Sequence, residues 1–180
     1  MNTVVKFHET GAPEVMRFET AEVDDPGPGQ VRLRHVAVGL NFADTYFRSG
    51  IYPVPLPSGL GNEASGIVQA VGAGVEHIKA GDRVTYTGFT NTLGAYCTER
   101  LIDAAPLIKL PEAISCEQAA AMTMRGLSAA YLCRKIYPFQ RGENILLHAA
   151  AGGVGLIVSQ WAKLLGLNVI GTVSTEAKAE

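Results

Sequence analysis

The sequence has no apolar run of the length that crosses a membrane. No stretch of the 180 residues approaches the roughly 20 apolar residues that a membrane-spanning helix needs, although 47% of the chain is hydrophobic. The run Met1–Lys6 reads as a strand and has no signal-peptide hydrophobic core. We therefore expect a cytoplasmic protein with a real core and no membrane partner.

Cysteine is scarce, and the charges nearly cancel. Cys97, Cys116 and Cys133 are an odd number without close spacing, which excludes a disulfide framework and a zinc knuckle. The net charge is −2 and both signs are dispersed. Because nucleic acids are bound through clustered basic residues, the sequence predicts no nucleic-acid partner.

The first part of the chain has the pattern of a β domain. Strands are predicted at 31–38, 66–71 and 83–86, which are rich in β-branched residues and bounded by turn clusters at 24–29, 72–74 and 80–82. The proline-rich stretch Tyr52–Pro57 predicts an extended loop, because each proline fixes its own backbone and restricts the residue before it. This pattern predicts a small barrel-like domain.

The pattern changes after about residue 110. Ser115 and Gln118 have the spacing of a capping box, so a helix should begin there and continue through Met122. A second helical run is expected from about Leu127 to Lys135. The strand 144–148, with an apolar run suited to burial on both faces, a helix through Gly166 and a strand at 168–173 then make a βαβ unit. The overall class is α/β.

A glycine turn lies between the predicted strand 144–148 and the next helix. The run reads Ala150-x-Gly152-x-x-Gly155. Such a turn leaves the strand tightly, lets the backbone approach a diphosphate, and presents the helix N-terminus to it. The cofactor-binding residues predicted here are Ala151, Gly152, Gly153, Val154 and Gly155. The alternative is a turn that serves only helix–strand packing.

The choice of cofactor depends on the residues at the end of the second strand of this unit. NAD-binding proteins usually carry Asp or Glu there for the ribose hydroxyls. This chain has Ser174, Thr175 and Lys178, which leave room and positive charge for a 2′-phosphate, so NADPH is predicted. Two readings compete: Glu176 as a ribose-binding carboxylate, and Lys178 as an ordinary solvated lysine.

Four segments resemble one family of enzymes: residues 38–53, 61–68, 80–84 and 148–155. They are similar to the zinc-independent, zeta-crystallin-like NADPH:quinone oxidoreductases of the medium-chain dehydrogenase/reductase superfamily. The resemblance implies a mainly-β GroES-like domain (1–125) and the first βαβ unit of a Rossmann NADPH-binding domain (126–180), truncated. It also implies an active site between the two domains and a homodimeric full-length protein.

The same segments argue against zinc. The resemblance places Asn41 and Asn62 where zinc alcohol dehydrogenases of this superfamily carry Cys and His. A catalytic zinc needs about three Cys, His or carboxylate ligands, and of that set only Glu63 remains. No metal is predicted.

By resemblance, Asn41 and Tyr46 should lie beside the nicotinamide, and Tyr52 should line the substrate pocket. Tyr46 is alternatively a core tyrosine, and Tyr52 a loop anchor. Ser128 matches a threonine that the family places against the cofactor, or is a helix-surface serine. Asp44 is interpreted as a structural hydrogen-bond acceptor rather than as a base.

The implied activity is NADPH-dependent reduction of a quinone by direct hydride transfer, without metal. Two alternatives stay open: reduction of the C=C bond of enones or alkenals, and a non-catalytic crystallin-like or RNA-binding role. Since a dinucleotide domain normally has about six strands, we expect the 180-residue chain alone to be weakly active or inactive. The sequence does not identify the quinone, the one- or two-electron course or the physiological role.

Overall fold

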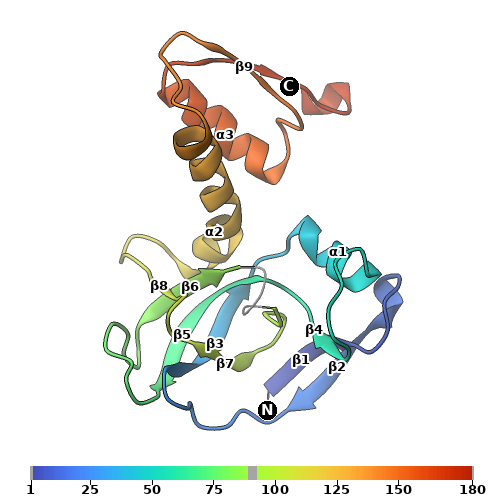
Figure 1. The fold of residues 1–180 in the computed structure, drawn as a ribbon, viewed down its shortest axis with the longest axis vertical. Helices are drawn as coiled ribbons and strands as arrows, with labels where there is room; N and C mark the ends of the chain where they lie inside the picture. Colours follow the sequence, from blue (N-terminus) through green and yellow to red (C-terminus); the bar gives the residue numbers. More distant parts are fainter. Residues whose placement is uncertain (1, 89–92, 180) are drawn as a thin grey trace. The chain divides into compact units, whose positions relative to one another are not determined.

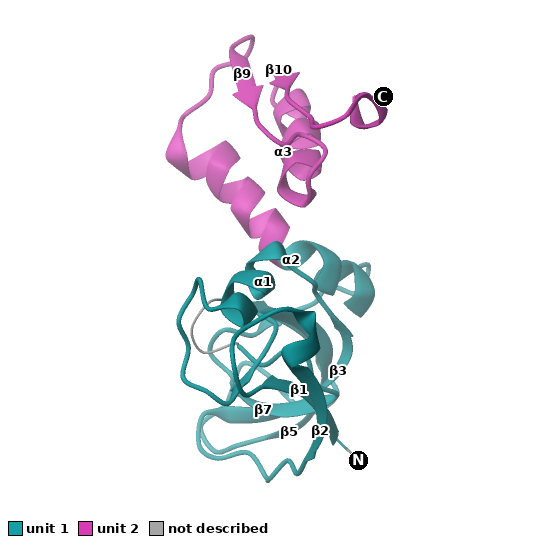
Figure 2. Ribbon diagram, turned by 90° about the vertical axis from the view of Figure 1, so that its right-hand side faces the viewer, with its two compact units in different colours: residues 1–123 teal, residues 124–180 magenta. Residues whose placement is uncertain are grey.

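The structure, a computed structural model, describes residues 2–88 and 93–179. It divides into two compact units, residues 1–123 and 124–180 (Figure 2). The functional division predicted at 125/126 stays a prediction, because compactness does not test function. No helix among the described residues has both the length and the apolar character needed to cross a membrane.

Unit 1 is built from two antiparallel sheets (Figure 1). The larger has the order β7-β3-β5-β6-β8, with bounds Glu99–Asp103, Gln30–Val38, Glu63–Val71, Arg83–Thr87 and Ile108–Lys109. The smaller has the order β2-β1-β4, with bounds Met16–Ala21, Asn2–Phe7 and Ser58–Gly59. Unit 1 also contains the helix α1 (Phe42–Ser49), the short η1 (Pro13–Val15) and the first residues of α2 (Cys116–Tyr131). The expected mainly-β first domain is confirmed.

The core of unit 1 follows from strand alternation. Val31 and Leu33 are fully buried on one face of β3, whereas Arg32 lies on the other. Val84 and Tyr86, two residues apart on β6, are also fully buried. Each such side chain stabilises the fold by about 1.5–3 kcal/mol through burial. The sheet that positions the candidate site is therefore held by a continuous core.

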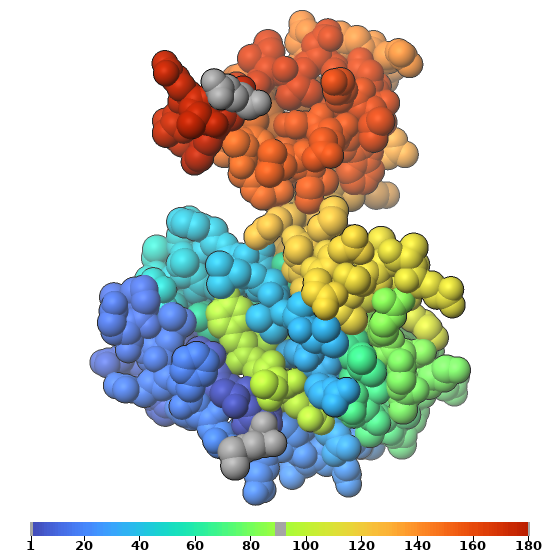
Figure 3. Space-filling model, turned by 180° about the vertical axis from the view of Figure 1, so that it is seen from behind, coloured from blue at the N-terminus to red at the C-terminus, as the bar shows by residue number. Residues whose placement is uncertain are grey.

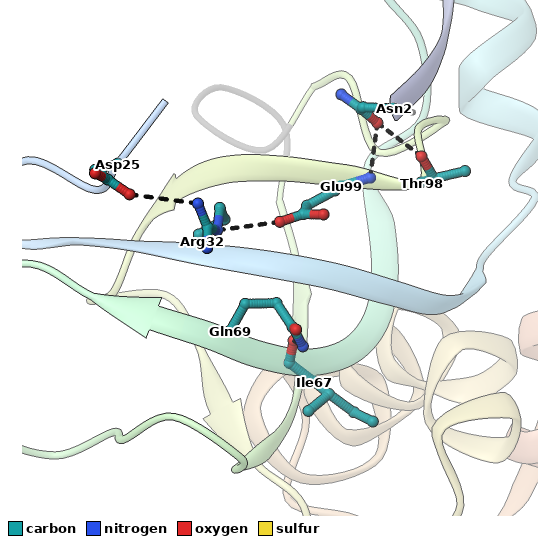
Figure 4. Close-up of polar contacts among 7 residues, drawn as sticks. All are labelled: Asn2, Asp25, Arg32, Ile67, Gln69, Thr98 and Glu99. Carbon is teal, nitrogen blue, oxygen red and sulfur yellow. Dashed lines mark hydrogen bonds and ion pairs between the residues drawn. The ribbon is translucent and has the colours of Figure 1, made fainter. Parts of the chain in front are cut away.

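The segment around β7 joins the two sheets. Residues 99–103 pair with β3, and Val4 forms a bridge with Cys97. Seen from behind, this yellow-green segment lies beside the blue strands (Figure 3). On its outer side, Arg32 lies 3.2 Å from Glu99, and Asn2 accepts hydrogen bonds from Thr98 and the Glu99 amide (Figure 4). These contacts connect the smaller sheet to the larger one.

The two predicted helical runs are one helix. The capping box is present, since the Ser115 amide donates to Gln118 at 2.9 Å and the Gln118 amide donates to Ser115 at 3.2 Å. From there α2 (Cys116–Tyr131) runs without a break and is followed by η2 (Leu132–Ile136), a π-helical segment. The expected interruption before Leu127 was wrong because one glycine, Gly126, costs a helix only about 1 kcal/mol and is tolerated.

Unit 2 contains the start of a Rossmann-type domain, as expected. Its strands β9 (Asn144–Leu147) and β10 (Asn168–Gly171) pair in parallel, and α3 (Gly153–Leu164) connects them. A short turn, η3 (Glu176–Lys178), comes after β10. Buried residues of α2, η2 and α3 form its core: Ala129, Cys133 and Val158.

The expectation that 144–148 is buried on both faces was wrong for the described chain. Leu146 is 61% exposed on β9, and Ile170 is 58% exposed on β10. Parallel sheets normally have both faces covered, and α3 packs against only part of this sheet. The apolar run is typical of a strand covered on both faces, and residues 124–179 cover this sheet only in part.

Candidate functional site

The glycine turn of unit 2 begins at a strained residue. Ala149 has a φ of 52°, which lies in the left-handed region. This conformation costs an L-residue other than glycine about 1–2 kcal/mol. The Ala149 carbonyl accepts the Gly152 amide at 2.8 Å, and the Gly152 carbonyl accepts the first helical hydrogen bond from Leu156 at 2.9 Å. The chain thus turns sharply from β9 into α3.

The first turn of α3 combines free backbone amides with close packing against the preceding turn. The amides of a helix's first turn have no intrahelical acceptor, and the helix dipole places positive charge at that end. A Cβ on Gly155 would collide with the Ala149 carbonyl oxygen and lie 2.6 Å from that of Ala150. A Cβ on Gly153 would lie 2.8 Å from the Arg125 side chain. The backbone here is suited to receive an anionic group.

A cavity of about 370 Å³ lies at this turn. Its wall combines the turn with the end of β10 and contains Ala149, Ala151, Gly152, Thr172, Val173, Ser174 and Lys178. Four of the predicted cofactor residues therefore share one cavity: Ala151, Gly152, Ser174 and Lys178. Gly153, Val154, Gly155, Thr175 and Ser128 are not in its wall, and the Ser128 hydroxyl donates to the Met124 carbonyl at 2.9 Å.

The polar end of this cavity carries the cation that the sequence singled out. The Lys178 ammonium donates to the Ser174 hydroxyl at 3.2 Å. Glu176, the competing carboxylate, is not in the wall. The arrangement places a hydroxyl and a positive charge together after β10, a pair suited to bind a phosphate group.

In unit 1, Asn41 sits at the N-cap of α1 and is 8% exposed. Its backbone amide donates to Asp44 at 3.0 Å, and its side-chain Nδ2 donates to Glu63 at 2.7 Å. Asp44 also accepts hydrogen bonds from the Asn62 side chain at 3.0 Å and the Tyr96 hydroxyl at 2.8 Å. We call these five residues the Asn41 network.

Four of the five residues of the Asn41 network are buried, and Tyr96 is partly buried. Asp44, Asn62 and Glu63 are 3%, 0% and 1% exposed. Burial, with the Asp44 carboxylate as a second cause, raises the pKa of Tyr96. The hydroxyl therefore stays protonated at neutral pH and donates to Asp44.

The predicted tyrosines lie in an aromatic cluster on α1 and the loop after it. Tyr46 packs edge-on against Tyr52 at 5.3 Å between ring centroids and against Phe42 at 5.4 Å. Tyr52 also contacts Phe47 and is 42% exposed. Among the described residues, the Tyr46 hydroxyl meets no partner, so it is open to an added group. Tyr52 serves both as a loop anchor and as an exposed ring.

In residues 2–88 and 93–179, no three His, Cys, Asp or Glu side chains gather as metal ligands. Instead, the side-chain amide of Asn41 donates to Glu63, and that of Asn62 donates to Asp44. Metal independence itself stays a prediction.

Sequence reasoning missed two parts of this site. Tyr96 lies 52 residues from Asp44 and reaches it only because the chain returns beside β1, which no local pattern shows. Thr172 and Val173 were not predicted, although they line the cavity between the turn and Ser174. The signal that could have found them is their position at the carboxyl end of a parallel strand, where such sheets bind ligands.

Comparisons with known proteins agree with this architecture. The alcohol dehydrogenase GroES-like domain matches residues 27–135. Quinone oxidoreductase 1 of Escherichia coli is 52% identical over the whole chain, and a 2-haloacrylate reductase of a Burkholderia species is 45% identical over 97% of it. The crystal structure of E. coli quinone oxidoreductase complexed with NADPH superposes with a TM-score of 0.94 at 53% identity, over 98% of this chain and 54% of that one.

The chain spans about half the length of the curated relatives it matches, 55% of the first and 54% of the second. The matched domain nevertheless covers more than half of the chain itself. The chain belongs to the alcohol dehydrogenase GroES-like family, within the medium-chain dehydrogenase/reductase superfamily, and is similar to that family's quinone oxidoreductases.

Proposed function

We propose that the protein at its natural length reduces quinones with NADPH by direct hydride transfer, without a metal. The observation that carries the proposal is the cavity shared by the glycine turn, Ser174 and Lys178. The similarity to a quinone oxidoreductase solved with NADPH supports it.

The residues present fit NADPH in two places. The first-turn amides of α3 would hold the diphosphate beside Gly152 in the cavity wall. Lys178 and Ser174 would hold the 2′-phosphate. Bound NADPH supplies the hydride, and the quinone becomes a hydroquinone on taking that hydride and one proton from water.

The chain's own contribution is position and shape. Asn41 would fix the nicotinamide side of the site, and Tyr46 offers a hydroxyl to a substrate oxygen. Tyr52, with the rings around it, would form an apolar wall for a flat acceptor. A quinone is already a good hydride acceptor, so no strong base is required. The homodimer, the cytoplasmic location and the remaining site residues stay predictions on the same footing.

The direct test is cofactor oxidation by the protein at its natural length. We expect NADPH to be oxidised with 1,4-benzoquinone, and NADH to be used poorly. Oxidation of NADPH only with a 2-alkenal would replace the proposal with the reading as a C=C reductase. That second candidate is favoured by the similarity to a 2-haloacrylate reductase, and it would make the Tyr46 hydroxyl essential as a proton donor.

Reversing the charge of Lys178 should shift the cofactor preference. In Lys178→Glu, a carboxylate would face the 2′-phosphate, and we expect the NADPH-over-NADH preference in kcat/KM to fall about tenfold, equivalent to roughly 1.4 kcal/mol. Lys163→Glu is the matched control, since Lys163 is in the last turn of α3 and outside this cavity. An equal fall in both variants would mean that overall charge, not Lys178, sets the preference.

A further inference from the structure

Two buried carboxylates hold Asn41 from different sides. Glu63 accepts its side-chain Nδ2, and Asp44 accepts its backbone amide. Neither carboxylate has a part in the proposed chemistry. Burying such groups is unfavourable unless hydrogen bonds compensate, so their shared contact with one site residue needs a reason.

We infer that Asp44 and Glu63 are positioning residues that orient Asn41 for the hydride transfer. The inference rests on the proposed function, because Asn41 matters for the rate only if it meets the cofactor. Neither carboxylate is expected to touch cofactor or substrate.

Glu63 determines which way the Asn41 carboxamide faces. The Asn41 Nδ2 donates to the Glu63 side chain at 2.7 Å, so the side-chain oxygen of Asn41 is directed away from Glu63. The chain makes room for this contact, because a Cβ on Gly39 would collide with the Glu63 carboxylate and lie 2.5 Å from the Ala120 carbonyl oxygen. Glu63 is therefore packed closely against the backbone of Gly39 and is 1% exposed.

Asp44 determines where the Asn41 backbone lies. The Asp44 side chain accepts the Asn41 amide, and the Asp44 amide donates back to the Asn41 carbonyl at 3.0 Å. Tyr96 and Asn62 donate to the two oxygens of the same carboxylate. The start of α1 is thereby tied to residues that approach from elsewhere in unit 1, so Asn41 does not depend on its own helix alone.

A capping box alone would stabilise α1 without affecting chemistry. The two roles differ in what a substitution changes. A purely structural role predicts a lower melting temperature with kcat preserved in the folded fraction. A positioning role predicts a fall in kcat that depends on Asn41 being present.

The test compares alanine and amide variants in the protein at its natural length. We expect Asp44→Ala and Glu63→Ala each to lower kcat about tenfold, with KM for NADPH within about twofold of wild type, since misplacement acts on the reacting geometry. Asp44→Asn and Glu63→Gln should stay within about twofold in kcat. In Glu63→Gln, the new side-chain oxygen can still accept the hydrogen bond from Asn41. In Asp44→Asn, the new NH₂ group faces Asn62, whose buried Oδ1 lacks a partner among the described residues and can rotate to accept from it.

The control is Asp82→Ala. Asp82 is another buried carboxylate of unit 1, at 8% exposure, but its partners are Lys79 and Lys109. This variant should lose stability and keep kcat. Preserved kcat in both network alanine variants would overturn the inference, and amide variants as slow as the alanine variants would assign the effect to charge instead of position.

Two further measurements keep the inference testable if alanine variants do not fold or no quinone is reduced. Tyr96→Phe removes one donor to Asp44 and should lower kcat two- to threefold; an unchanged kcat would count against Asp44. The Asn41 side-chain NH₂ signal, assigned by its loss in Asn41→Ala, should move in Glu63→Gln and not in Asp82→Ala. An unmoved signal would contradict the Glu63 contact even in a protein without quinone turnover.

Discussion

Gly155→Ala should weaken NADPH binding by about 100-fold, equivalent to roughly 2.8 kcal/mol of binding free energy. Alanine normally favours a helix over glycine by about 1 kcal/mol, so propensity alone would make the variant more stable. The added Cβ would instead collide with the Ala149 carbonyl oxygen and lie 2.6 Å from that of Ala150. Both neighbours are backbone atoms of the turn itself, so α3 can accept the methyl group only by moving away from the strand.

The measurement is calorimetric titration of NADPH into the folded variant. Gly126→Ala is the matched control, because Gly126 is also helical and a Cβ there has nothing within 4 Å. We expect that control to keep its affinity and to gain up to about 1 kcal/mol of stability. Wild-type affinity in Gly155→Ala would mean that the turn does not receive the diphosphate.

Features that depend on neighbouring residues were predictable from the sequence. The capping box of Ser115 and Gln118 is local chemistry, and the structure contains both of its hydrogen bonds. The glycine turn and the polar residues after β10 were found by the same kind of reasoning. Their meeting in one cavity follows from the parallel pairing of β9 and β10.

Features that depend on distant pairing were not predictable. Asp44 was correctly interpreted as a hydrogen-bond acceptor, but its partner Tyr96 reaches it only through the return of the chain beside β1. Leu146 shows the opposite error, since its apolar neighbours indicate burial that the described residues do not supply. A local sequence pattern predicts whether a residue is buried or hydrogen-bonded, but only the tertiary structure shows which residues bury it or bond to it.

His35 should make the protein sensitive to acid. Its Nδ1 lies 2.9 Å from the Cys97 carbonyl, so Nδ1 carries the hydrogen, and Nε2 accepts from the Tyr86 hydroxyl at 3.1 Å. The neutral ring satisfies both contacts, and burial lowers the pKa of His35 from 6.5 to about 4.

Because the folded-state pKa lies below the unfolded value, the unfolded chain binds the extra proton between these two pH values. The contribution of the neutral His35 ring to the free energy of unfolding is complete above about pH 6.5. It is lost as the pH falls toward 4, at about 1.4 kcal/mol per pH unit and roughly 3 kcal/mol in all. Urea unfolding from pH 7.5 to 4 would measure it. His35→Phe should be less stable at pH 7.5, since it removes the hydrogen bonds that the ring makes with the Cys97 carbonyl and the Tyr86 hydroxyl, but its pH profile should be flatter by this amount. Tyr86→Phe is the control, because it keeps the imidazole and should keep the dependence of stability on pH. Parallel profiles for wild type and His35→Phe would show that another group causes the acid sensitivity.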